Sequence, residues 1–167
     1  MLRRTTLILA GVALLGVALM GGALATTSSG VTAETARGPL VDRQLNVTMQ
    51  FDNSKAMVQL KTKAPIEVAV QRIVAQPGAT FGWHSHPGPT IVTVLSGTLS
   101  FYHAEDCTAR IQYTAGQSFS NLPDEIHLAR NEGSVDLVVY ASYYVPLMSP
   151  PVPLRIDQPS PGAECPL

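Results

Sequence analysis

The chain has 167 residues, of which 46% are hydrophobic and 14% are charged, and its formal net charge is −1. This composition excludes an intrinsically disordered chain, because such chains are poor in apolar residues and rich in charge. It also argues against a nucleic-acid-binding protein, which needs a concentrated basic face. The length suits one folded domain.

The first 25 residues have the pattern of a secretory signal peptide. Arg3 and Arg4 provide a positive start, residues 7–20 form an apolar stretch expected to be a signal helix, and Ala23-Leu24-Ala25 fits the small-x-small cleavage pattern. The apolar stretch is shorter than the roughly 20 residues that a membrane-spanning helix needs. We therefore expect export, to the outside or to the cell envelope or periplasm. An uncleaved segment that anchors the protein in a membrane is the alternative.

Residues 26–44 are small and polar with no apolar periodicity, which predicts a linker. Residues 45–147 contain short runs of β-branched and aromatic residues between Gly, Pro, Asn and Asp, which predicts an all-β domain. The clearest strands are 66–74, 91–95, 98–102, 110–113 and 135–145. Ser96-Gly97 predicts a tight hairpin. So many short strands must close into a barrel or pack as a sandwich to bury their apolar faces.

Residues 148–167 are rich in proline, which excludes a helix and disfavours a central strand. We expect an extended arm on the surface of the barrel. The chain has two cysteines, Cys107 and Cys165, and an even pair in an exported protein predicts a disulfide. Such a bond would attach the arm to the barrel.

Three of the four histidines have the spacing of a metal site. His84 and His86 alternate in an extended segment, so both imidazoles should lie on one face of it. His127 begins another β segment and would complete the cluster from a second strand. Three neutral imidazoles that converge on one point form a typical site for a divalent metal ion. His103 lies in a polar turn and is expected to be a surface residue.

The neighbours of these histidines have a spacing that resembles the two conserved motifs of the cupin superfamily. In the first motif, glycine, His-x-His, glutamate and glycine follow at set intervals, and in the second, glycine, proline, glycine, histidine and asparagine. The matching residues are Gly78, His84, His86, Gly97, Gly116, His127 and Asn131, whereas Thr90 occupies the glutamate position and Leu122 and Asp124 the proline and glycine positions. The resemblance implies a single double-stranded β-helix, or jelly-roll barrel, with a metal ion on its three histidines.

Thr90 in the glutamate position leaves a three-histidine site with no certain fourth protein ligand. A neutral threonine is a poor ligand, so we expect Thr90 to support the ligands or to line the pocket. Glu125 could lie near the metal if its strand has already begun, but we favour a solvated loop acid. The ion is divalent, and these residues do not distinguish Fe, Mn, Zn, Ni or Cu.

Phe81 and Trp83 alternate with His84 and are expected to face away from the metal, toward another sheet or a second copy of the chain in a homodimer.

Two functions are consistent with this site. The first is a metal-binding protein that binds a small molecule, and the alternative is a metal-dependent dioxygenase-type enzyme that acts on one. The cupin fold does not choose between them, and no residue can be assigned a catalytic role.

Overall fold

The computed structural model of the chain describes residues 24–40, 45–50, 57–63 and 65–167. The predicted signal peptide lies outside the described residues except for its last two positions. Within the described ranges, no helix is long and apolar enough to cross a membrane.

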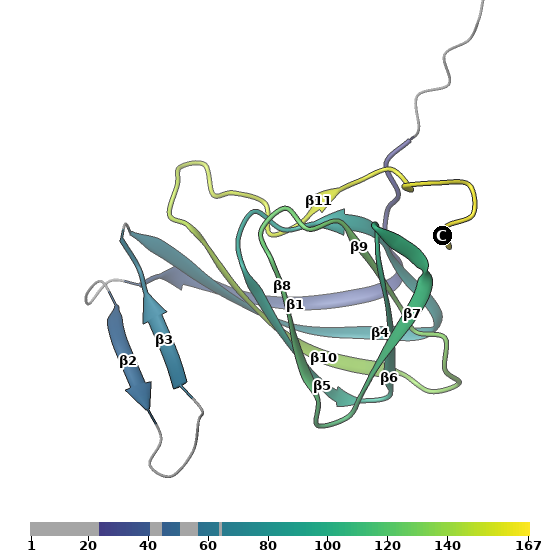
Figure 1. Ribbon diagram of the computed structural model, residues 1–167, viewed down its shortest axis with the longest axis horizontal. Coiled ribbons are helices and arrows are strands. Elements are labelled where there is room, and N and C mark those ends of the chain that lie inside the picture. Colours follow the sequence, from purple (N-terminus) through teal and green to yellow (C-terminus); the bar gives the residue numbers. More distant parts are fainter. Residues whose placement is uncertain (1–23, 41–44, 51–56, 64) are drawn as a thin grey trace, which may run out of the picture.

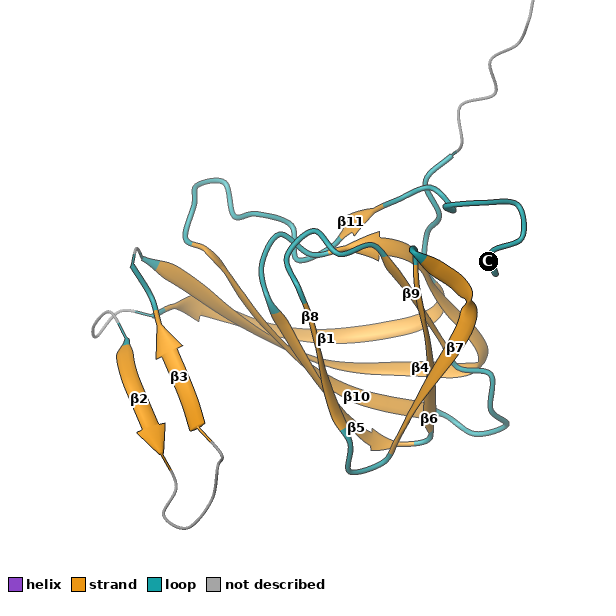
Figure 2. Ribbon diagram, viewed as in Figure 1, coloured by secondary structure: helices purple, strands orange, loops and turns teal. Residues whose placement is uncertain are grey.

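The secondary structure of the described residues is made of β-strands (Figure 2). The strands are β1 (Ser29–Pro39), β2 (Asn46–Gln50), β3 (Met57–Lys61), β4 (Ile66–Ser85), β5 (Thr90–Ser96), β6 (Thr98–His103), β7 (Asp106–Thr114), β8 (Ser118–Asn121), β9 (His127–Arg130), β10 (Leu137–Pro146) and β11 (Ile156–Asp157). Each of the five strands predicted most clearly from the sequence overlaps one of these. The all-β prediction is confirmed, with the strands arranged as a nearly closed antiparallel barrel consistent with a jelly roll (Figure 1).

The long strand β4 belongs to both faces of the barrel. Its first half, up to Ala75, pairs with β1 on one side and β10 on the other, and β10 continues the sheet through β5 to β8. Its second half, from Thr80, pairs with β9, which continues through β6 to β7. The bend between the halves contains Gly78, whose φ is 79°, a backbone conformation that glycine adopts without strain. The last residues of β4 therefore belong to the second sheet, beside β9.

The predicted hairpin at Ser96-Gly97 is wrong, because the two strands that it joins do not pair with each other. β5 pairs with β8 and β10, whereas β6 pairs with β7 and β9. The turn instead carries the chain from one sheet to the other. Gly97 has a φ of 80°, and a Cβ atom there would lie 2.8 Å from the backbone oxygen of Asp136. The position thus requires glycine even though it is not a hairpin turn.

The predicted linker at 26–44 is wrong over Ser29–Pro39, which forms β1 along the first half of β4. Its residues are small and mostly exposed, so its sequence lacks the apolar alternation that marks a strand. Backbone hydrogen bonds hold it to β4, and Arg37 donates two hydrogen bonds to Glu67. Strand pairing of this kind needs no apolar face.

Strands β2 and β3 fall within the range predicted for the barrel, but they pair only with each other. This hairpin projects from one end of the barrel (Figure 1).

Two groups of buried side chains stabilise the molecule. The main core fills the barrel between the sheets. A second cluster lies beneath the C-terminal arm, and its members are Trp83, Tyr102, Cys107, Leu128 and Cys165. Cys107 and Cys165 form a disulfide, as predicted. The indole Nε1 of Trp83 donates to the backbone oxygen of Pro166 at 2.8 Å, so the arm is attached at its end as well as along β11.

Candidate metal centre

The local backbone of β4 brings His84 into the barrel. A register shift interrupts the pairing with β9 between Thr80 and Trp83, and Gly82 in this bulge has a φ of 68°. A Cβ atom at Gly82 would lie 2.8 Å from the backbone oxygen of Thr27. The bulge breaks the strict alternation of faces along the strand.

Because of this bulge, the prediction that Phe81 faces away from the metal is wrong. Phe81 lines the same cavities as His84 and His86. Trp83 does face the outside of the barrel, but it is fully buried in the cluster under the arm. Neither side chain is free to contact a second copy of the chain, so the face expected for a homodimer is already covered by the chain itself.

The three predicted ligands come together from two strands. His84, near the end of β4, is paired directly with His127 at the start of β9, and His86 follows the end of β4. The ring centroids are 4.9 Å apart for His84 and His86, 4.3 Å for His84 and His127, and 5.1 Å for His86 and His127. One nitrogen from each ring lies within 4.8 Å of the others, and all three side chains are buried.

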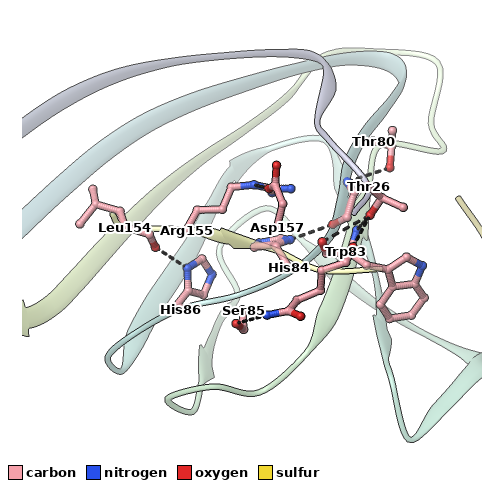
Figure 3. Close-up of polar contacts among 11 residues, drawn as sticks. Thr26, Thr80, Trp83, His84, Ser85, His86, Leu154, Arg155 and Asp157 are labelled. Carbon is pink, nitrogen blue, oxygen red and sulfur yellow. Dashed lines mark hydrogen bonds and ion pairs between the residues drawn. The ribbon is translucent and has the colours of Figure 1, made fainter. Parts of the chain in front are cut away.

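Backbone carbonyl groups fix the tautomer of each imidazole. Nδ1 of His84 is 2.8 Å from the oxygen of Gly82, and Nδ1 of His127 is 2.9 Å from that of Glu125. Nδ1 of His86 is 2.7 Å from the backbone oxygen of Leu154 (Figure 3). A carbonyl oxygen only accepts, so each Nδ1 carries the proton and each Nε2 keeps its lone pair. Metal-binding histidines are commonly oriented by a partner of this kind.

Burial also keeps the imidazoles neutral. It holds the pKa of His84 well below its ordinary value, and the nearby His127 adds to the shift. Burial likewise lowers the pKa of His86, and it lowers that of His127 to about 3, with a further contribution from His86. Protonation would place positive charges close together away from water. At neutral pH the cluster therefore offers three uncharged nitrogen donors.

The metal-free protein should lose stability as the pH falls below about 6.5. Histidines in the unfolded chain take up protons there, whereas His127 in the folded state does not until about pH 3, so acid favours the unfolded state. We expect His127 alone to reduce the free energy of unfolding by about 1.4 kcal/mol between pH 7.5 and 5.5. Urea denaturation of the metal-free protein measures this change. An equal or higher stability at pH 5.5 would contradict it.

Thr90 is fully buried, and its hydroxyl group lies 3.5 Å from the backbone oxygen of Gly88. Its direct strand partner Asn121 lines the cavity of about 40 Å³ that the three histidines also line. The side-chain oxygen of Asn121 is buried and has no hydrogen-bond partner among the described residues. Asn121 was missed from the sequence, because it belongs to neither motif and ends a short strand.

The carboxylate of Glu125 contacts groups outside the cluster of His84, His86 and His127. One oxygen is 2.7 Å from Nδ1 of His103, and the other accepts the backbone N–H of Leu122 at 2.8 Å. Its contact with the site is the backbone oxygen that orients His127. His103 itself is partly exposed, with a relative side-chain exposure of 41%.

Asp124 occupies the glycine position of the second motif, and its backbone conformation shows why few residue types suit that position. Its φ is 60°, a left-handed conformation that aspartate tolerates better than most side chains. Its backbone N–H donates to the oxygen of His86 at 2.8 Å. The loop before His127 is thereby joined to the segment that carries the other two histidines of the cluster.

The C-terminal arm contributes to the site, which sequence reasoning did not foresee. Leu154 and Arg155 line a pocket of about 470 Å³ together with His84, His86 and Tyr143. The phenol ring of Tyr143 lies 5.3 Å from the ring of His86. No motif marks the arm residues, and they reach the histidines only because the arm folds back across the barrel.

Comparison with known proteins identifies the family. Residues 71–143 match the family model of the cupin domain, and this range contains the three histidines. This part of the chain is therefore a cupin domain, as its motifs suggested. Among curated protein sequences, none matches this chain.

Several solved structures are similar to part of the chain. An oxalate oxidase structure is 21% identical over 50% of this chain and 53% of its own, with a TM-score of 0.41. An uncharacterized conserved protein with a double-stranded β-helix domain from Klebsiella pneumoniae is 20% identical over 64% and 79%, with the same score. Oxalate decarboxylase from Bacillus subtilis is 22% identical over 46% and 21%, with a TM-score of 0.41. The chain thus spans about half of the oxalate oxidase, and likenesses this weak carry no argument about function.

Proposed function

We propose that this protein is an exported metal-binding cupin protein in which His84, His86 and His127 hold one divalent metal ion through Nε2. The pocket at the mouth of the barrel then receives a small ligand beside the metal. The observation that carries the proposal is the orientation of the three imidazoles. Each Nδ1 is held by a backbone carbonyl oxygen, so the three lone pairs are available to a shared ion.

The residues around the cluster fit a metal ion. Three neutral imidazoles are a common donor set for divalent transition metals. The unpartnered side-chain oxygen of Asn121 lines the same cavity, and a metal ion or its bound water would satisfy it. Three protein ligands leave positions for water or a ligand. The metal would supply a Lewis-acid centre that holds an oxygen atom of the ligand.

Export is supported by the disulfide between Cys107 and Cys165, because disulfides persist mainly in oxidising compartments. The pattern of the first 25 residues supports the same location, and anchoring by an uncleaved segment is the alternative.

Metal analysis of the protein isolated from its native host tests the proposal. We expect one equivalent of a divalent metal, and we expect His84→Ala to lower the affinity for that metal at least ~100-fold, more than the loss of an outer partner. His103→Ala is the matched control, because this histidine is partly exposed and contacts the carboxylate of Glu125 outside the cluster. The proposal fails if no loading condition gives stoichiometric metal, or if the two variants bind it equally.

The enzymatic alternative has one observation in its favour. The pocket of about 470 Å³ reaches two of the three histidines, so a small substrate would have access to a metal bound there. Iron in the native protein, with consumption of O₂ that His86→Ala abolishes, would support a dioxygenase-type reaction. Native zinc would contradict it, because zinc has no redox chemistry.

A further inference from the structure

The C-terminal arm places one charged side chain beside the candidate metal centre. Val152 and Leu154 of the arm pack against the main core, and the backbone oxygen of Leu154 holds Nδ1 of His86 at 2.7 Å (Figure 3). Immediately afterwards, β11 pairs with the end of β4. Arg155 lies between these two attachments, so its backbone is fixed next to the histidines.

The guanidinium group of Arg155 is only partly used by the protein. Its Nε donates to Oδ1 of Asp157 at 2.5 Å, which orients the planar group. Its Nη2 is buried and has no hydrogen-bond partner among the described residues. A buried donor without an acceptor is unfavourable. A hydrogen-bond acceptor on a bound molecule would therefore be favourable beside Nη2, because the described residues supply none.

The surroundings of Arg155 indicate what kind of acceptor fits. Arg155 lines the pocket of about 470 Å³ with His84 and His86. The other cation in that lining, Arg37, is already neutralised by two hydrogen bonds to Glu67. The pocket wall also has an apolar part, formed by Val31, Ile73, Phe81 and Leu154. The pocket thus combines one incompletely paired guanidinium group with apolar surface, close to the metal ligands.

We propose that this pocket binds a small organic carboxylate, whose oxygen atoms accept hydrogen bonds from Arg155 while its apolar part lies along the wall next to the metal. The planar guanidinium group matches the geometry of a carboxylate. The inference rests on the proposed function, because the ligand would lie next to the metal ion that this function places on the histidines.

The test uses the full secreted chain loaded with Co(II), whose visible spectrum reports ligands near the metal. Acetate, butyrate and benzoate are each titrated into this protein. Butyramide, the neutral analogue of butyrate, and inorganic phosphate are titrated in the same way for comparison. Isothermal titration calorimetry measures each affinity in parallel. We expect at least one carboxylate to bind, at least ~10-fold more tightly than butyramide or phosphate. Arg155→Met should weaken that carboxylate ~10- to 100-fold, and Arg155→Lys should weaken it less, since it keeps the charge but not the planar group.

Arg110→Met is the matched control. Arg110 lies on β7, is half exposed and pairs with Glu132, so its removal should leave carboxylate binding unchanged. Equal binding of butyramide, tighter binding of phosphate, or unchanged carboxylate binding in both Arg155 variants would overturn the proposal. Thermal melting establishes that each variant is folded. Failure of the unmodified chain to bind Co(II) would instead contradict the proposed function, so the two failures are distinguishable.

Discussion

Replacing both cysteines, Cys107→Ser with Cys165→Ser, should lower the free energy of unfolding by about 4 kcal/mol. The disulfide closes a loop with a sequence separation of 58, and removing it allows the unfolded chain many more conformations. The bond also lies in the buried cluster with Trp83. Because Trp83 is the single tryptophan, its fluorescence during urea denaturation reports directly on this corner.

The reduced unmodified protein is the appropriate control, since it lacks the bond but keeps both sulfur atoms. Its stability should fall by about the same amount as that of the double variant. A loss below about 1 kcal/mol in both would show that the arm is held mainly by its hydrogen bonds and that the chain-entropy account does not apply here.

Asn131→Ala should cost about 3 kcal/mol of stability, because its side chain makes three hydrogen bonds, each worth about 1 kcal/mol. Its Nδ2 donates to the backbone oxygens of Ala75 and Val135, both at 2.8 Å, and its Oδ1 accepts the N–H of Gly133 at 3.0 Å. The side chain is only 1% exposed, so water cannot replace these bonds. Urea denaturation of the metal-free protein measures the loss.

Asn121→Leu provides a matched contrast at a second buried asparagine. Its side-chain oxygen has no partner among the described residues, so removing it should change the stability of the metal-free protein by less than about 1 kcal/mol. Metal affinity should instead fall, since Asn121 lines the cavity of the histidines. If Asn131→Ala lowers the free energy of unfolding less than Asn121→Leu does, both assignments are wrong.

The two motifs predicted the three-histidine cluster for local reasons. His84 and His86 are separated by one residue, and the side chains of an extended chain return to the same face at that interval. The motif glycines also have a local reason. Gly78 and Gly97 both adopt a positive φ, which glycine reaches without strain. The orientation of Phe81 was not predictable in this way. It depends on the bulge at Gly82, where the pairing with β9 shifts register, and pairing partners are not visible in a local pattern.

The sequence by itself determined an all-β cupin domain, the three histidines and the pairing of its two cysteines, because strand alternation, motif spacing and cysteine number are properties of short segments or of composition. Only the tertiary structure decided that the arm belongs to the site. The hydrogen bond from His86 to Leu154 spans a sequence separation of 68. The unpartnered nitrogen of Arg155 lies in the same pocket as the histidines only because the arm folds back onto the barrel. Burial, hydrogen-bond partners and cavities arise from contacts between distant segments, and these form when the chain folds.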